Sequence, residues 1–178
     1  MTIPLDIFVA AIQQLLLAAT FFIIPIVAQR YGDQAQQVAE KAVTDQALGT
    51  EKDFLLRHGI KFSESGLEML LPFGIATVLT IISILNLSQA EIGRILTWIV
   101  EPLLLVVVGY ITGAQVFTAW YLKRAFEKLE DERLRQVNIE AFLQAAARAF
   151  PVWLRPLQVF RFGLATVGSI VVMLLLAT

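Results

Sequence analysis

The sequence predicts an all-α integral membrane protein with four transmembrane helices and helical cytoplasmic extensions. Of its 178 residues, 57% are hydrophobic and only 16% are charged, whereas soluble domains have about 25% charged residues. Four stretches contain no Asp, Glu, Lys, Arg or His: 7–29, 69–90, 102–122 and 162–178. Each is close to the roughly 17–20 residues that a helix needs to cross a bilayer. They are continuously apolar rather than alternating, which favours helices over a closed barrel.

The positions of Lys and Arg predict the orientation of the chain, because basic residues accumulate in cytoplasmic loops. Of the 14 basic residues, five lie in segment 29–65, eight lie in segment 123–161, and only Arg94 lies elsewhere. We therefore expect both segments in the cytoplasm and both termini outside. The expected location is a plasma or inner membrane.

The first predicted span begins after Pro4, a residue that suits the first turn of a helix, and ends near Ala28. Pro25 is expected to kink this helix or to mark its end. Gln13 and Gln14 lie about two turns inside the span. Amides at such a depth usually form hydrogen bonds with a neighbouring helix, and the alternative is that they line a transport pathway.

Cytoplasmic helices are predicted after the first span. Apolar residues at helical spacing indicate a weakly amphipathic helix over 35–48, which Gly49 is expected to end. Thr50 and Asp53 resemble a capping pair for a short helix that ends at Arg57.

Two Ser-x-x-Glu patterns, Ser65–Glu68 and Ser88–Glu91, are predicted capping boxes for the second span and for the helix after it. The pair Glu101 and Pro102 is predicted to interrupt that helix, so that the third span begins at Pro102. Glu101 is expected near the outer surface, where a helix N-terminus favours a negative charge. The alternative is a membrane-embedded carboxylate that binds a cation or a proton.

The second half of the third span carries Gly109 and Gly113, a small-x-x-x-small motif that allows close helix packing, and Gln115 follows. From Leu122 a charged helix is predicted to continue to Ala149, with opposite charges at four-residue spacing. We expect residues 122–149 to bind a membrane-complex partner or a second copy of the chain.

A six-residue motif occurs twice, as Phe-Gly-Ile-Ala-Thr-Val at 73–78 and as Phe-Gly-Leu-Ala-Thr-Val at 162–167. It suggests an internal duplication, in which 1–88 and 89–178 each form a span, a cytoplasmic helical segment and a returning span. Such repeats would be parallel, related by an axis along the membrane normal. The alternative is a chance match between apolar sequences.

The polar and small residues inside the spans are the candidates for helix packing or for a polar path. They are Gln13, Gln14, Gly74, Thr77, Glu101, Gly109, Gly113, Gln115, Gly163 and Thr166. Within the repeated motif, Gly74 and Gly163 are expected to allow close packing. Thr77 and Thr166 lie three residues further along and are expected near the centre of the helix bundle.

No catalytic, cofactor-binding or metal-binding residues are predicted. The chain has no Cys and a single His, and it lacks zinc, P-loop and Ser-His-Asp patterns. We expect a non-enzymatic subunit or adaptor that docks a partner, or itself, through its cytoplasmic helices, with no nucleic-acid partner. A homo-oligomeric channel or small transporter is the first alternative, although no span carries a charge near mid-depth. A membrane-embedded transferase-type enzyme is the second.

Overall fold

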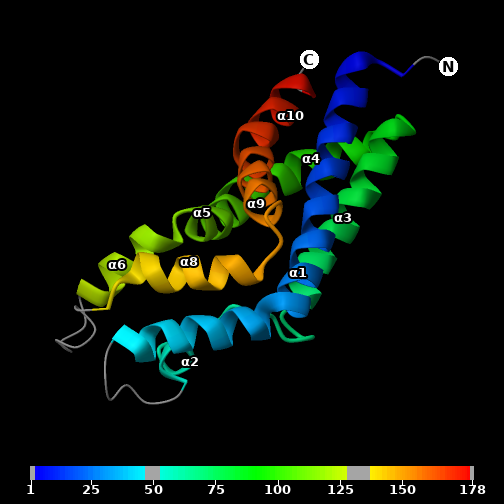
Figure 1. The fold of residues 1–178 in the computed structure, drawn as a ribbon. Helices are drawn as coiled ribbons and strands as arrows, with labels where there is room; N and C mark the ends of the chain where they lie inside the picture. The colour runs from blue at the N-terminus through cyan, green and yellow to red at the C-terminus, as the bar shows by residue number, and fades with distance from the viewer. Residues whose placement is uncertain (1–2, 47–52, 128–136, 177–178) are drawn as a thin grey trace. The chain divides into compact units, whose positions relative to one another are not determined.

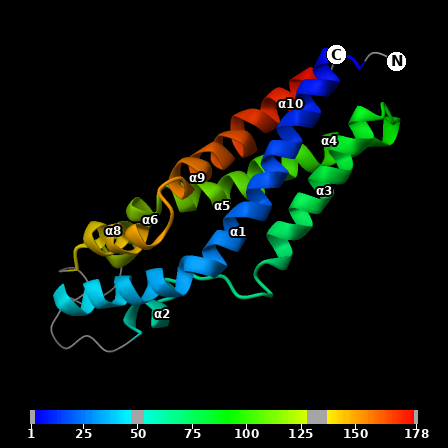
Figure 2. The same ribbon diagram turned by 45° about the vertical axis from the view of Figure 1, so that its right-hand side comes forward.

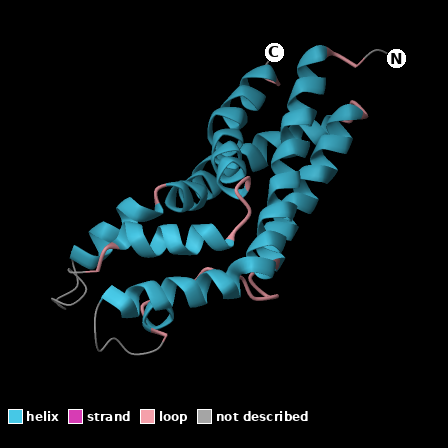
Figure 3. Ribbon diagram, in the orientation of Figure 1, coloured by secondary structure: helices cyan, strands magenta, loops and turns pink. Residues whose placement is uncertain are grey.

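The computed structural model describes residues 3–46, 53–127 and 137–176. All secondary structure in these ranges is helical (Figures 1 and 3). The segments η1 and η2 are π-helical. In chain order the elements are α1 (Leu5–Gln46), α2 (Phe54–Arg57), α3 (Leu70–Leu87), α4 (Glu91–Leu103), η1 (Leu104–Val108), α5 (Gly109–Val116), α6 (Thr118–Glu127), α8 (Ile139–Ala149), α9 (Leu154–Gly163), η2 (Leu164–Gly168) and α10 (Ser169–Leu175).

Four helical segments are long and apolar enough to cross a membrane: Leu5–Gln46, Leu70–Leu87, Glu91–Val116 and Leu154–Leu175. The third segment comprises α4, η1 and α5, and the fourth comprises α9, η2 and α10. The predicted all-helical fold with four apolar helices is therefore confirmed. The duplication of the two halves, and their boundaries, stay predictions.

The chain forms two compact units. The first unit contains 1–24, 67–116 and 155–178, and the second contains 25–66 and 117–154. The division falls at Pro25, yet α1 is helical on both sides of this proline. Pro25 therefore does not end the helix.

The first unit holds the apolar helices around a core of small and medium side chains. Leu17 and Phe21 of α1 pack with Leu79 of α3 and Leu104 of η1. The N-terminal half of α1 also lies beside α10, where Ala10 packs with Val172 and Leu176 (Figure 2). Large apolar side chains also cover the outward faces of these helices, which is what contact with lipid requires. Examples are Ile84, Val106 and Leu174, which are 58%, 69% and 66% exposed.

The second unit has a hydrophobic core of its own. Ala35, Ala39 and Val43 follow one another at four-residue spacing along α1, and each is fully buried. They pack with Leu55 of α2 and Phe142 of α8. The helix predicted from residue 35 onward is therefore not a separate element. It is the C-terminal part of α1, which runs to Gln46, and its apolar positions form the buried face of that part.

Several predicted helix boundaries are wrong. α3 begins at Leu70, after the Ser65–Glu68 pattern. The hydroxyl group of Ser88 donates to the carbonyl oxygen of Leu85 in the preceding helix, at 2.9 Å, so it does not cap α4. The predicted capping of α2 by Thr50 lies outside the described residues, as does Gly49.

The charged helix predicted over 122–149 is not continuous. α6 ends at Glu127 and α8 begins at Ile139. The backbone of Asn138 is extended, and its side-chain oxygen accepts a hydrogen bond from the backbone N–H of Ala141 at 3.1 Å. Asn138 is therefore the N-cap of a new helix. Residues 128–136 lie outside the described part of the chain.

Candidate functional site

Five polar side chains are buried together inside the first unit. They come from α1, α3, α4 and α10, so each of the four apolar segments contributes at least one. Each is at most 4% exposed. We call this group the polar cluster, and its members are Gln14, Asn86, Thr97, Glu101 and Ser169.

Hydrogen bonds connect four members of the polar cluster. The Gln14 amide donates from Nε2 to Glu101 Oε1 at 2.9 Å and to Thr97 Oγ1 at 3.4 Å. Asn86 Nδ2 donates to Gln14 Oε1 at 3.1 Å and to Thr97 Oγ1 at 2.9 Å. Gln14 therefore lies between Asn86 and Glu101 and links three helices.

Three buried side-chain oxygen atoms of the first unit form no well-aligned hydrogen bond with the described part of the chain. They are Glu101 Oε2, Ser169 Oγ and Gln13 Oε1. The Ser169 side chain lies beside the Glu101 carboxyl group, to which its hydroxyl group can donate a hydrogen bond.

The structure places Glu101 differently from the prediction. Glu101 follows Glu91, the first residue of α4, by ten residues, or about 15 Å of helix axis at 1.5 Å per residue. It is fully buried. Pro102 lies inside the same helix and does not interrupt it. The expectation that Glu101 lies at a helix start is therefore wrong.

Sequence reasoning could have found part of the cluster. Thr97 and Glu101 are four residues apart, so they lie on one face of a helix. That face also contains Gly93, whose carbonyl oxygen accepts from Thr97 Oγ1 at 2.9 Å. Asn86 and Ser169 are polar residues within otherwise apolar stretches. This pattern could also have marked them as candidates, although Ser169 lies only two residues after the repeated motif at 162–167.

Gln115 does not belong to the polar cluster. Its Oε1 accepts a hydrogen bond from the guanidinium group of Arg161, which is 4% exposed. The Arg161 guanidinium also lies over the ring of Phe21, 5.3 Å from its centroid. This contact is a cation–π interaction inside the first unit.

The glycines of the two predicted motifs differ in their surroundings. A Cβ at Gly109 would lie 3.3 Å from Thr166 Cγ2, and one at Gly113 would lie 3.4 Å from Phe162 Cε2. The small-x-x-x-small motif therefore does bring helices close together. At Gly74 and Gly163, by contrast, a Cβ would meet no atom within 4 Å, so the expected close packing is absent at both.

The two copies of the repeated motif also differ in backbone and exposure. Residues 73–78 belong to the regular helix α3, whereas 162–167 run from α9 into the π-helical η2. Thr77 is exposed and donates to the carbonyl oxygen of its own helix at Phe73. The expectation that Thr77 lies near the centre of the bundle is therefore wrong.

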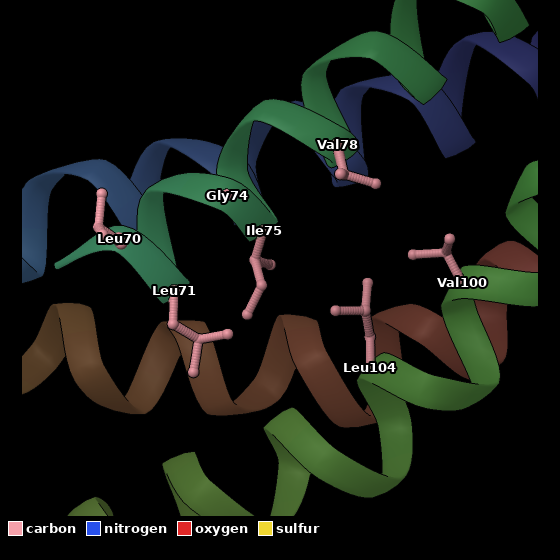
Figure 4. A pocket seen from close by; sticks show the side chains of 7 residues that line it. All are labelled: Leu70, Leu71, Gly74, Ile75, Val78, Val100 and Leu104. Carbon is pink, nitrogen blue, oxygen red and sulfur yellow. The ribbon is translucent and has the colours of Figure 1, made fainter. Parts of the chain in front are cut away.

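Gly74 lies instead at an apolar groove between α3 and the segment formed by α4 and η1. Figure 4 shows aliphatic side chains that extend into it from both sides. Its volume is about 310 Å³. The lining residues are Leu70, Leu71, Gly74, Ile75, Val78, Val100 and Leu104. Since no polar side chain lines this groove, it offers no group for catalysis or for ion binding.

The glycines give a prediction about stability. A Cβ at Gly93 would lie only 2.8 Å from backbone and side-chain atoms of Asn86. We expect Gly93→Ala to lower the free energy of unfolding by about 1–3 kcal/mol through overpacking. Gly74→Ala and Gly163→Ala should leave it unchanged or raise it by about 0.5–1 kcal/mol, because alanine favours helix. Reversible unfolding in detergent measures the free energy of unfolding of the three variants. The same change in that free energy for all three would contradict the prediction.

The fold and the site define an all-helical protein with four apolar helical segments around a buried polar cluster. Comparison of the chain with known protein families, curated proteins and solved structures finds no match. Within the described residues, no three His, Cys, Asp or Glu side chains are grouped to hold a metal ion.

Proposed function

We propose that this chain is a four-span integral membrane protein that transports a small cation or a proton, with Glu101 as its ionisable group. The complete burial of the Glu101 carboxyl group carries the proposal. Ionisable residues inside membrane helices are rare and usually mark ion or proton pathways. The sequence-based objection to transport was that no span carries a charge near mid-depth. The burial of Glu101, ten residues into α4, speaks against that objection.

The charge distribution supports this assignment. The basic segments 29–65 and 123–161 are proposed to face the cytoplasm, with both termini outside.

The positions of Gln14 and Glu101 along their helices also support the proposal. Gln14 lies nine residues after Leu5, or about 14 Å along α1. Glu101 lies about 15 Å along α4. If each helix begins at the membrane surface, both distances correspond to about half of a hydrocarbon core that is about 30 Å thick.

A flux measurement tests the proposal. The purified full chain is reconstituted into liposomes that contain a pH-sensitive dye or a sodium-sensitive dye. A membrane potential set by valinomycin and potassium then drives entry of cations. We expect a dye signal above that of protein-free liposomes prepared in parallel. A signal that stays at the protein-free level for both dyes would refute transport.

The second candidate is an adaptor or complex subunit that docks a partner, or a second copy of itself, through the second unit. The observation in its favour is that this unit builds its own core from α1, α2, α6 and α8. The backbone N–H of Asn138 also donates to Gln46 Oε1 at 2.7 Å, which ties α8 to the end of α1. Purification in mild detergent with mass determination tests it. A stoichiometric foreign chain or a mass of several copies supports this candidate, and a mass equal to that of one chain argues against it.

A further inference from the structure

One face of α6 carries aromatic and basic side chains together. Its members recur at intervals of three and four residues, so they lie on one side of the helix. They are Phe117, Trp120, Tyr121 and Arg124, and we call them the α6 stripe. Phe117 directly precedes α6, and its carbonyl oxygen accepts from the backbone N–H of Tyr121 at 3.1 Å, which continues the helical spacing. The three aromatic side chains are 53%, 55% and 39% exposed, and Arg124 is exposed as well.

The opposite side of α6 holds this helix in the second unit. Leu122 packs against the core of that unit, which contains Phe142 of α8. The two helices contact each other (Figures 1 and 2). Successive residues of a helix are rotated by about 100°, so Leu122 lies on the side away from the α6 stripe. The stripe is therefore the outward face of a packed helix.

The α6 stripe begins where the third apolar segment ends. That segment is Glu91–Val116, so Trp120 lies four residues after its last residue. Four residues of extended chain reach at most about 14 Å. If the third segment spans a bilayer, the covalent chain therefore keeps Trp120 close to the membrane surface. Trp and Tyr are enriched at this level of membrane proteins, where their rings meet the lipid headgroups.

The stripe combines its aromatic rings with a stacked cation. The rings of Trp120 and Tyr121 meet edge to face, with centroids 4.9 Å apart and an interplanar angle of 85°. The guanidinium group of Arg124 lies over the Trp120 ring, 5.4 Å from its centroid. This cation–π contact holds the charged group at the exposed surface of the helix. A guanidinium group matches the geometry of phosphate oxygens, with which it forms paired hydrogen bonds.

The local charge favours an anionic partner. Lys123 and Arg124 are both exposed. Between Glu101 and Glu127 the chain has no acidic residue. The α6 stripe therefore presents two adjacent positive charges beside apolar rings, which is the chemistry that a layer of phosphate headgroups over hydrocarbon complements.

The chain before the fourth apolar segment has the same composition. That segment is Leu154–Leu175, and the exposed Trp153 directly precedes it. Arg148 is exposed near the end of α8, and no acidic residue occurs in 141–178. Exposed tryptophan and arginine thus accompany both places where the second unit continues into an apolar segment.

We propose that the α6 stripe, together with Lys123, binds the headgroups of anionic phospholipids. The proposed orientation places segment 123–161 in the cytoplasm, and the cytoplasmic leaflet carries the anionic lipids. The inference rests on the membrane insertion included in the proposed function, and it does not depend on Glu101 or on flux.

Quenching of single tryptophans by brominated lipids tests this inference. The chain has three tryptophans, Trp98, Trp120 and Trp153, and replacing two of them with Phe leaves one reporter. The full chain with the Trp120 reporter is reconstituted into phosphatidylcholine bilayers that contain a small fraction of brominated phosphatidylglycerol or, in parallel, brominated phosphatidylcholine. We expect a preference for phosphatidylglycerol of about fivefold for each basic side chain at the headgroups, equivalent to ~1 kcal/mol. The preference should decrease as NaCl is added.

Substitutions of the basic side chains assign the preference to the α6 stripe. Lys123→Gln and Arg124→Gln should each lower it about fivefold, whereas Arg124→Lys retains the charge and should retain most of the preference. Lys41→Gln is the matched control, because it removes an exposed positive charge from α1 in the same unit. The preference of this control should equal that of the unsubstituted reporter.

Equal quenching of Trp120 by the two lipids would overturn the inference, as would a preference that persists in Lys123→Gln and Arg124→Gln. Absence of quenching by either lipid would also overturn it, since another protein chain would then cover the stripe. The Trp98 reporter separates these failures from that of the proposed function, because Trp98 is 45% exposed on the third apolar segment. Quenching of Trp98 without a lipid preference at Trp120 would refute only the lipid surface. No quenching of Trp98 would refute membrane insertion and therefore both proposals.

Discussion

Replacing Glu101 with glutamine is expected to reduce cation or proton flux in liposomes to the level of protein-free vesicles. Glutamine has nearly the same size, and its carbonyl oxygen can still accept from Gln14 Nε2, so the packing around α4 is kept. Only the ionisable group is lost. A charge at the centre of a bilayer costs about 2.5–3.5 kcal/mol. Without a compensating carboxylate, occupancy of the site should fall about 100-fold.

Glu91→Gln is the matched control for this prediction. It makes the same chemical change on the same helix, but at an exposed position in the first turn. Its flux should equal that of the wild type, with both variants compared at equal protein per vesicle. Flux in Glu101→Gln that stays within a factor of about two of the control would show that the carboxylate is no carrier, since the expected loss is about 100-fold.

The number of apolar helices could be predicted from the sequence because the bilayer proposed for this chain would impose a simple requirement. A backbone in hydrocarbon must satisfy its own hydrogen bonds, so a charge-free stretch of sufficient length becomes a helix. The ends of the helices could not be predicted in the same way. α1 continues from Ala28 to Gln46 through polar residues, because its buried face at Ala35, Ala39 and Val43 packs in the second unit. That packing is not visible in local composition.

The polar cluster could not be assembled from the sequence for a related reason. Gln14 and Glu101 are 87 residues apart, and Asn86 and Gln14 are 72 apart. A local pattern instead assigned Glu101 to a helix start, since proline after an acidic residue suits a first turn. Pro102 also suits the interior of an apolar helix when neighbouring groups satisfy the freed carbonyl. Contacts with distant parts of the chain determine whether Glu101 and Pro102 lie at the start or in the interior of a helix, and a local pattern does not contain these contacts.

Gln14 should be the residue on which the stability of the polar cluster depends most. It is the hydrogen-bond donor to Glu101 Oε1, and its own Oε1 accepts from Asn86. Gln14→Leu would leave Glu101 and Asn86 without these partners. We expect the free energy of unfolding to fall by about 1.5–3 kcal/mol, the range for a hydrogen bond to a charged group. Reversible unfolding in detergent, followed by the fluorescence of the tryptophans, measures this loss.

The double variant Gln14→Leu/Glu101→Leu should be more stable than Gln14→Leu alone, although it should carry no flux. Removing both partners also removes the penalty of a buried group that lacks its hydrogen bond. The coupling energy of this double-mutant cycle distinguishes two roles for the cluster. Hydrogen bonds between membrane helices average only about 0.6 kcal/mol in such cycles. A coupling energy well above about 1 kcal/mol would mark a desolvated ionisable site, whereas a value near the average would mean that Gln14 and Glu101 merely hold α1 and α4 together.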